Sequence, residues 1–216
     1  QADLRTLAGA AIVSTVAEFG YSANISSDGD TAVVGSPGEV GGATGLGAVY
    51  IYLRTGSTWA FQAKLGLATV PSCTITLTLN TGNSRLGSDC FLIIYGNTLA
   101  IGAPANNSNR GAVWICVRNV ATWSQQIVIG TPTAAGRYGY TGFSTGITVT
   151  QLGYSIQLSA SGNTLVAGGP RDGSNGTTGG TLDTGAVWVF QRATGATTWT
   201  QQALFRLATA AAGVVL

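Results

Sequence analysis

The 216-residue chain has no histidine and no methionine, and only 8% of its side chains are charged. Histidine is the commonest general base at neutral pH and a frequent zinc ligand. Its absence therefore excludes a serine–histidine triad, a cysteine–histidine pair and a histidine-bound metal. The eight acidic residues lie in turns, loops or the first segment, and the repeat brings no two of them together as a glycosidase requires. These absences predict a protein that is not an enzyme.

Positive charge is equally sparse, because the ten basic residues are scattered singly and the net charge is only +2. Nucleic acids and anionic membrane surfaces are recognised by clustered Lys and Arg, so neither partner is expected. Apolar runs of roughly 18 residues, which a membrane helix needs, are also missing from the sequence. The lack of an initiator methionine is expected of a chain that begins at a processed or truncated end.

A threefold internal repeat is the main feature that is present. Gly20, Gly87 and Gly153 lie 67 and 66 residues apart, and each opens the same pattern. Each copy continues with a glycine-containing turn, a Gly-x-Pro segment, a Gly-Ala-Val-aromatic segment and a segment that begins with tryptophan. The last two features fall at 47–50, 111–114 and 185–188, and at Trp59, Trp123 and Trp199. A fixed period of this length is typical of repeat architectures.

Within each copy the apolar residues alternate with a period of two, which predicts strands rather than helices. Four antiparallel strands in about 45 residues are the plan of a β-propeller blade. The predicted fold class is therefore all-β, with one β-propeller segment over 1–216. The recurring tryptophans favour packing between blades over stacking on a sugar. The predicted blades span 18–65, 85–129 and 151–205, with connections at 66–84 and 130–150.

Three blades leave two faces uncovered, because propellers close with about four to eight blades. Two interpretations stay open at this point. The chain is either a segment of a longer propeller, or copies of it complete one another.

Four phrases of the repeat resemble the FG-GAP repeat, which builds the N-terminal propeller of integrin alpha subunits. They are Phe19-Gly20-Tyr21-Ser22, Gly102-Ala103-Pro104, Gly111-Ala112-Val113-Trp114 and Trp123-Ser124-Gln125-Gln126. The resemblance implies an extracellular or surface-exposed propeller that serves adhesion or recognition. The second and third copies open with Leu-Gly, and the acidic calcium loop of the integrin type is missing. No cofactor is therefore expected, and Asp172 is a weak calcium candidate.

Partner-binding residues are expected in the loops, which vary while a rigid scaffold holds them. The three loops after Gly-x-Pro differ in length, and their polar candidates are Glu39, Arg110, Asp172 and Asp183. The partner would be a protein, a glycan or further copies of the same assembly. One alternative is a carbohydrate-binding propeller lectin with Tyr21 and Tyr154 at the blade junctions, a series that Ser88 breaks. Another is a self-assembling fibre or coat subunit.

Three cysteines and three glycosylation motifs complete the candidates. Cys73 in a connection can reach Cys90, which makes this pair the disulfide candidate; three buried thiols are the alternative. Cys90 and Cys116 lie two strands apart, at about 9.6 Å, which exceeds the reach of a disulfide. Asn24, Asn106 and Asn175 satisfy the Asn-x-Ser/Thr rule and are candidates if the protein follows a eukaryotic secretory route.

Overall fold

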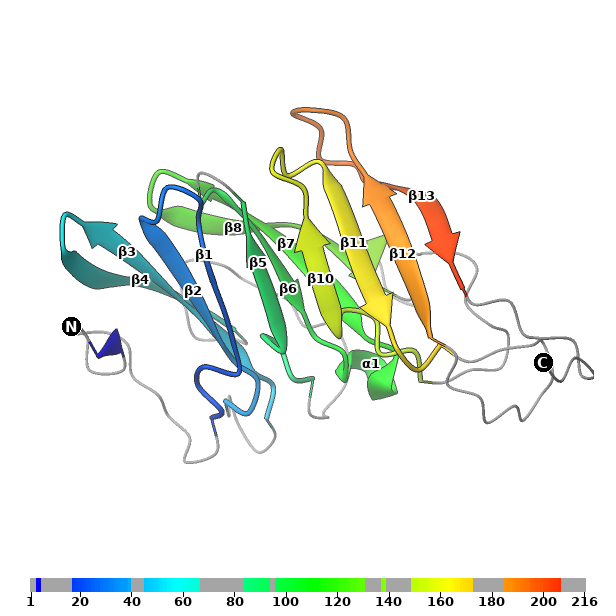
Figure 1. The fold of residues 1–216 in the computed structure, drawn as a ribbon. Coiled ribbons are helices and arrows are strands. Elements are labelled where there is room, and N and C mark those ends of the chain that lie inside the picture. The colour runs from blue at the N-terminus through cyan, green and yellow to red at the C-terminus, as the bar shows by residue number, and fades with distance from the viewer. Residues whose placement is uncertain are drawn as a thin grey trace, which may run out of the picture.

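The computed structural model is almost entirely β-structure, arranged as three sheets in chain order (Figure 1). Each sheet contains four consecutive antiparallel strands, which confirms the predicted all-β class and the threefold repeat of four-stranded units. Helices long and apolar enough to cross a membrane are missing from the part of the chain that the structure describes. That part comprises residues 3–4, 17–39, 45–66, 84–93, 96–130, 137–138, 149–172 and 185–206.

The strands of each sheet follow one another in space as they do in the sequence. The first sheet contains β1 (Ser22–Ile25), β2 (Thr31–Ser36), β3 (Ala48–Thr55) and β4 (Thr58–Gly66). The second contains β5 (Asp89–Leu92), β6 (Thr98–Gly102), β7 (Ala112–Asn119) and β8 (Thr122–Gly130), and the third contains β10 (Ser155–Leu158), β11 (Thr164–Gly169), β12 (Ala186–Gln191) and β13 (Thr200–Phe205). A short strand that the sequence did not predict, β9 (Arg137–Tyr138), pairs parallel with β8. The segment labelled α1 (Asn106–Asn109) is a short turn in the loop before β7, and the backbone of Asn107 and Ser108 in it is not that of a right-handed helix.

Turn chemistry sets the first hairpin of each sheet, as predicted. Gly29, Gly96 and Gly162 lie between the first and second strands with φ of +75°, +64° and +69°. A side chain at these positions would be strained, whereas glycine adopts this conformation readily. β2 and β11 end directly before Pro37 and Pro170, which cannot donate a hydrogen bond to a sheet.

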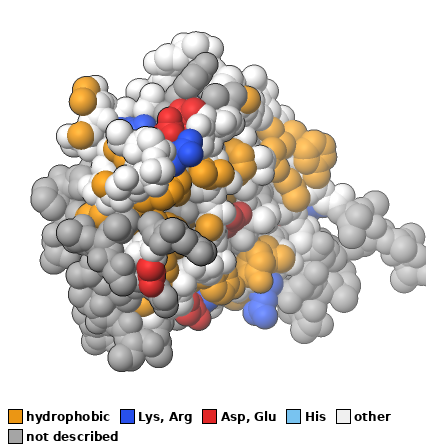
Figure 2. Space-filling view, turned by 60° about the vertical axis from the view of Figure 1, so that its left-hand side comes forward, with side chains coloured by type: hydrophobic (Ala, Val, Ile, Leu, Met, Phe, Trp, Pro, Cys, Tyr) orange, Lys and Arg blue, Asp and Glu red, His pale blue; other side chains and the backbone are white. Residues whose placement is uncertain are grey.

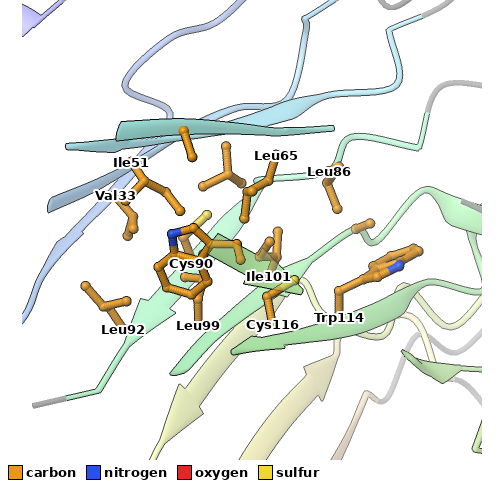
Figure 3. Packing of buried hydrophobic residues seen from close by; sticks show 14 of the residues in the cluster. Val33, Ile51, Leu65, Leu86, Cys90, Leu92, Leu99, Ile101, Trp114 and Cys116 are labelled. Atoms are coloured by element: carbon orange, nitrogen blue, oxygen red, sulfur yellow. The ribbon is translucent and has the colours of Figure 1, made fainter. Parts of the chain in front are cut away.

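Apolar side chains fill the space between neighbouring sheets. Figure 3 shows Val33, Ile51 and Leu65 of the first sheet pointing toward Cys90 and Ile101 of the second. A corresponding cluster lies between the second and third sheets. The sheets are therefore packed face to face, which is consistent with a β-propeller-like arrangement, and the described residues form no closed sheet. On the face seen in Figure 2, charged side chains are few and scattered among apolar and neutral ones.

Glycine allows the backbones of neighbouring sheets to approach closely. A Cβ added to Gly35 would lie 2.0 Å from the carbonyl oxygen of Gly87, and one added to Gly102 would lie 2.0 Å from that of Gly153. Any side chain at either position would push the next sheet away.

A polar joint also connects the sheets, and it occurs twice. The side-chain oxygen of Gln62 on β4 accepts hydrogen bonds from Trp123 Nε1 at 3.1 Å and from Arg118 Nη1 at 3.4 Å. Gln126 on β8 accepts equivalent bonds from Trp199 Nε1 at 3.4 Å and from Arg192. Both tryptophans are buried, at 1% and 2% exposure, so the prediction that they pack between sheets is confirmed. We call this contact the Gln–Trp–Arg joint.

The arginine of each joint, and Arg54 at the equivalent place in the first sheet, is positioned by its own sheet. Its guanidinium lies over the tryptophan ring of that sheet, and its Nε donates to the Asp or Asn side chain of the first hairpin turn. Partial burial lowers the pKa of Arg118 and Arg192, because the charged form loses contact with water. The three sets are Arg54, Trp59 and Asp30; Arg118, Trp123 and Asn97; and Arg192, Trp199 and Asn163.

Candidate functional site

Three turns of one design lead into the first strand of each sheet; we call them the start turns (18–21, 85–88 and 151–154). In each, the backbone N–H of the fourth residue donates to the carbonyl of the first, and the third residue is a glycine with positive φ. The first residue has a left-handed backbone although it is not glycine. These residues are Glu18 (φ 55°), Arg85 (φ 53°) and Gln151 (φ 58°).

Backbone strain is concentrated around these turns. Asn107, Ser108 and Asn109, in the loop before β7, also have positive φ. Six of the seven such non-glycine residues in the described chain thus lie in the start turns or in this loop; the seventh is Val120 in the β7–β8 hairpin. Each conformation costs about 1–3 kcal/mol and persists only where the surrounding structure enforces it, as it often does at binding sites.

A pocket of about 130 Å³ lies where the start turns and this loop meet; we call it the start-turn pocket. The loop is fixed to the third start turn, because the carbonyls of Asn109 and Arg110 accept from the N–H groups of Gln151 and Leu152 at 2.8 and 3.1 Å. The side chains that line the pocket include Tyr21, Arg85, Ser88, Asn109, Gln151 and Tyr154.

Aromatic and neutral polar groups dominate the start-turn pocket. Tyr21 and Tyr154 are 53% and 54% exposed, so both rings are accessible to a ligand, Tyr21 on the side away from Arg85. Arg85 is held in place by an ion pair with Glu18 at 2.9 Å, and its guanidinium carbon lies 5.2 Å from the centre of the Tyr21 ring. Because the charge of Arg85 is paired, the pocket offers mainly ring faces, amides and hydroxyls. Such a surface suits a neutral, polar ligand.

Sequence reasoning identified part of this site. The interpretation as a lectin placed Tyr21 and Tyr154 at the blade junctions, with Ser88 as the break in the series, and all three line one pocket in the structure. Sequence reasoning missed Arg85 and Gln151. Each lies two residues before the glycine that opens its repeat, so the sequence does show that the two positions are equivalent. Their left-handed backbone is not visible, because residues of these types rarely adopt it.

The predicted partner-binding residues of the loops occupy different environments. Glu39 is buried, and one of its oxygens lies 2.7 Å from Lys64 Nζ. Arg110 is partly exposed beside the start-turn pocket, whereas Asp183 lies outside the described residues. Asp172 is buried and paired with Arg206, so a guanidinium occupies a carboxylate oxygen that calcium would need. The described residues contain no group of three or more acidic, cysteine or histidine side chains that could hold a metal ion.

The glycosylation candidates are also placed differently. Asn24 lies on β1, and its side-chain oxygen accepts from the N–H of Leu92 at 3.1 Å. Asn106 is only 1% exposed, and its amide nitrogen, the atom that a glycan would occupy, donates to Ser84 Oγ at 3.3 Å. Asn175 lies outside the described residues. Modification of all three stays a prediction.

Cys90 is a buried thiol on β5 with no disulfide partner among the described residues, and burial raises its pKa to about 12. Cys73, its predicted disulfide partner, lies outside the described residues, so the pairing also stays a prediction. A thiol with so high a pKa is almost entirely protonated at neutral pH, and it is therefore a poor nucleophile.

A second cavity, of about 430 Å³, runs along the first strands of the three sheets. Its polar side chains already hold the sheets together. Asp89 accepts from the N–H of Cys90 at 2.9 Å and from that of Ile156, on the third sheet, at 2.7 Å. Burial nevertheless raises the pKa of Asp89. The start-turn pocket is the better ligand site, because its tyrosines are open to solvent.

Comparisons with known proteins give a fold-level result. No protein-family model matches the sequence, and no curated protein matches it. Sqt1 from Saccharomyces cerevisiae is similar in structure, with a TM-score of 0.50 and 9% identity over 89% of this chain and 37% of that one. A Bacteroides uniformis protein whose name as a 6-phosphogluconolactonase is provisional gives a TM-score of 0.48 and 10% identity over 85% of this chain and 40% of that one. The chain thus spans about two fifths of the length of either protein. At such identities the likeness to Sqt1 concerns the fold alone.

Proposed function

We propose that this chain is a non-catalytic recognition module, built from β-propeller blades of the FG-GAP kind, that binds its ligand at the start-turn pocket outside the cell or on its surface. The observation that carries the proposal is the coincidence of two features at one place. The strained residues Arg85 and Gln151 line the pocket, and so do the exposed rings of Tyr21 and Tyr154; the equally strained Glu18 is paired with Arg85. The blade family and the location rest on the sequence resemblance.

A glycan is the ligand class that the chemistry favours. Ring faces pack against the apolar face of a sugar, and amide and hydroxyl groups such as those of Asn109, Gln151 and Ser88 pair with its hydroxyls. An anion would require free positive charge, but Arg85 is already paired with Glu18. A neutral glycan end therefore fits the pocket better than a phosphate or a sulfate.

A glycan array followed by calorimetry tests this function. Tyr21→Ala and Tyr154→Ala are each expected to weaken binding of the best array ligand by about tenfold or more, because each removes an aromatic contact. Ile25→Ala is the matched control, since Ile25 is also 53% exposed but lies on β1 away from the pocket.

Two results would contradict the proposal. Silence on every glycan would overturn the ligand class. A ligand whose affinity is unchanged by both tyrosine variants would overturn the site.

A further inference from the structure

The outer face of the third sheet has the composition of an interior surface. In the first two sheets, three positions on the face toward the following sheet are completely buried. The equivalent positions of the third sheet are Val166, Val187 and Phe205, which are 37%, 36% and 60% exposed. Their buried counterparts are Val33, Val49 and Leu65, and Ala100, Val113 and Ile129.

A glycine on this face points the same way. Gly35 and Gly102 are required where they are, because the backbone of the following sheet approaches them. Gly168 is their equivalent in the third sheet, yet the nearest atom to an added Cβ there is the hydroxyl oxygen of Ser155, at 2.8 Å within the same sheet. The third sheet thus leaves room for a backbone at Gly168.

The two outer sheets each carry one half of a further Gln–Trp–Arg joint that does not form within the described part of the chain. Gln202 is the third-sheet equivalent of Gln62 and Gln126, but it is exposed, and its amide nitrogen donates to Thr200 Oγ1 of the same strand at 3.1 Å. At the opposite end of the array, the first sheet carries the other half. Arg54 lies over Trp59, which is only half-buried.

The first start turn matches this pattern. A Cβ added to Gly87 would lie 2.7 Å from the carbonyl oxygen of Ala48 in the preceding sheet, and one added to Gly153 would lie 2.6 Å from that of Ala112. Gly20, their equivalent, has no atom within 4 Å of such a Cβ. The first start turn therefore has the backbone of a docking turn and an open space in front of it.

We propose that a second copy of this chain docks its first sheet onto the outer face of the third sheet and repeats the joint that links the sheets within one chain. Gln202 then accepts from Trp59 and Arg54 of the other copy, and the start turn containing Gly20 approaches Gly168. The seat is a hollow of about 440 Å³ on the third sheet, lined in part by Val187, Phe205 and Gly168.

Continuity with the internal joints selects this occupant. Gln202 on the third sheet and the Arg54–Trp59 pair on the first sheet stand at the places of the two joint halves, and two joints of this design already form within the chain. An unrelated partner would not need a glycine at 168 or a glutamine at 202. The aromatic outer side of the first sheet is buried in the single chain, where Tyr50 and Tyr52 are 0% exposed and Leu4 packs against them, so docking has to displace Leu4 from this side.

Sedimentation equilibrium of the full chain over a range of concentrations tests the proposal. The native chain is expected to form species of two or more copies. Phe205→Asp and Gly168→Ala are each expected to raise the dissociation constant by about tenfold or more, by placing a charge or a methyl group in the seat. Val120→Asp is the matched control, because Val120 is 92% exposed at the tip of the β7–β8 hairpin. It should associate like the native chain.

Hydrogen exchange at low and high concentration then identifies the surfaces. Head-to-tail docking protects the start turn at 18–21 and the third-sheet strands β11 and β13 together. A native chain that stays monomeric at every concentration would overturn the proposal. So would equal weakening by Val120→Asp, or protection confined to the third sheet.

Discussion

Replacing Gln62 by alanine should weaken the contact between the first and second sheets without touching the apolar layer. The change removes the Gln62 side-chain oxygen, which accepts hydrogen bonds from Trp123 Nε1 at 3.1 Å and from Arg118. The Trp123 side chain is only 1% exposed, so water cannot easily replace the lost acceptor. A buried donor left without a partner costs about 1–3 kcal/mol. For a chain of this length, that loss corresponds to a decrease in melting temperature of about 2–12 °C.

Urea and thermal unfolding, followed by circular dichroism on dilute samples, measure the effect. Gln202→Ala is the matched control, because Gln202 holds the equivalent position without a following sheet, and its free energy of unfolding should change by no more than about 0.5 kcal/mol. A double-mutant cycle with Trp123→Phe should give a coupling of about 0.5–1.5 kcal/mol between Gln62 and Trp123. Equal destabilisation by Gln62→Ala and Gln202→Ala, or zero coupling, would refute the joint.

Three further predictions concern the contacts between sheets. Gly102→Ala should strongly lower the melting temperature in a thermal scan, because its methyl group would lie 2.0 Å from a carbonyl oxygen of the next sheet, whereas Gly168→Ala should leave it nearly unchanged. Cys90 should resist alkylation in the native protein at pH 8 and react only on unfolding, since burial raises its pKa to about 12. Mass spectrometry after a timed iodoacetamide pulse measures the labelling. Labelling of Cys90 before unfolding would contradict its burial. Burial also raises the pKa of Asp89 in the folded state, so its contribution to stability is greatest below the unfolded pKa of about 3.9 and decreases as the pH rises toward the folded value. Urea titrations between pH 3 and 6 should show this trend relative to Asp89→Asn, and the opposite slope would refute it.

Much of the fold could be predicted from local patterns. Alternation of apolar residues, the glycine turns and the recurring Trp59, Trp123 and Trp199 predicted three four-stranded units, and the structure contains them. These signals are local in sequence, so a single copy of the repeat carries them. β9 escaped prediction because two residues, Arg137 and Tyr138, are too few to show a period.

The polar contacts between sheets could not be predicted from the sequence. Gln62 meets Trp123 across 61 residues, and Asp89 meets Ile156 across 67. No rule of spacing within one copy predicts such pairs, because they depend on how the sheets face one another. The start-turn pocket could be predicted in part. The sequence identified Tyr21 and Tyr154 as related positions, but only the fold places them around one cavity.

The placement of both joint halves on every repeat has a consequence for how such a chain can change in length. Each unit of 66 or 67 residues carries its own acceptor glutamine on one side and its own tryptophan and arginine on the other. Duplicating or deleting one unit by genetic recombination therefore leaves a glutamine opposite a tryptophan and an arginine at every remaining joint. An array of this kind can grow or shrink by whole units while the loops after Gly-x-Pro vary in length separately.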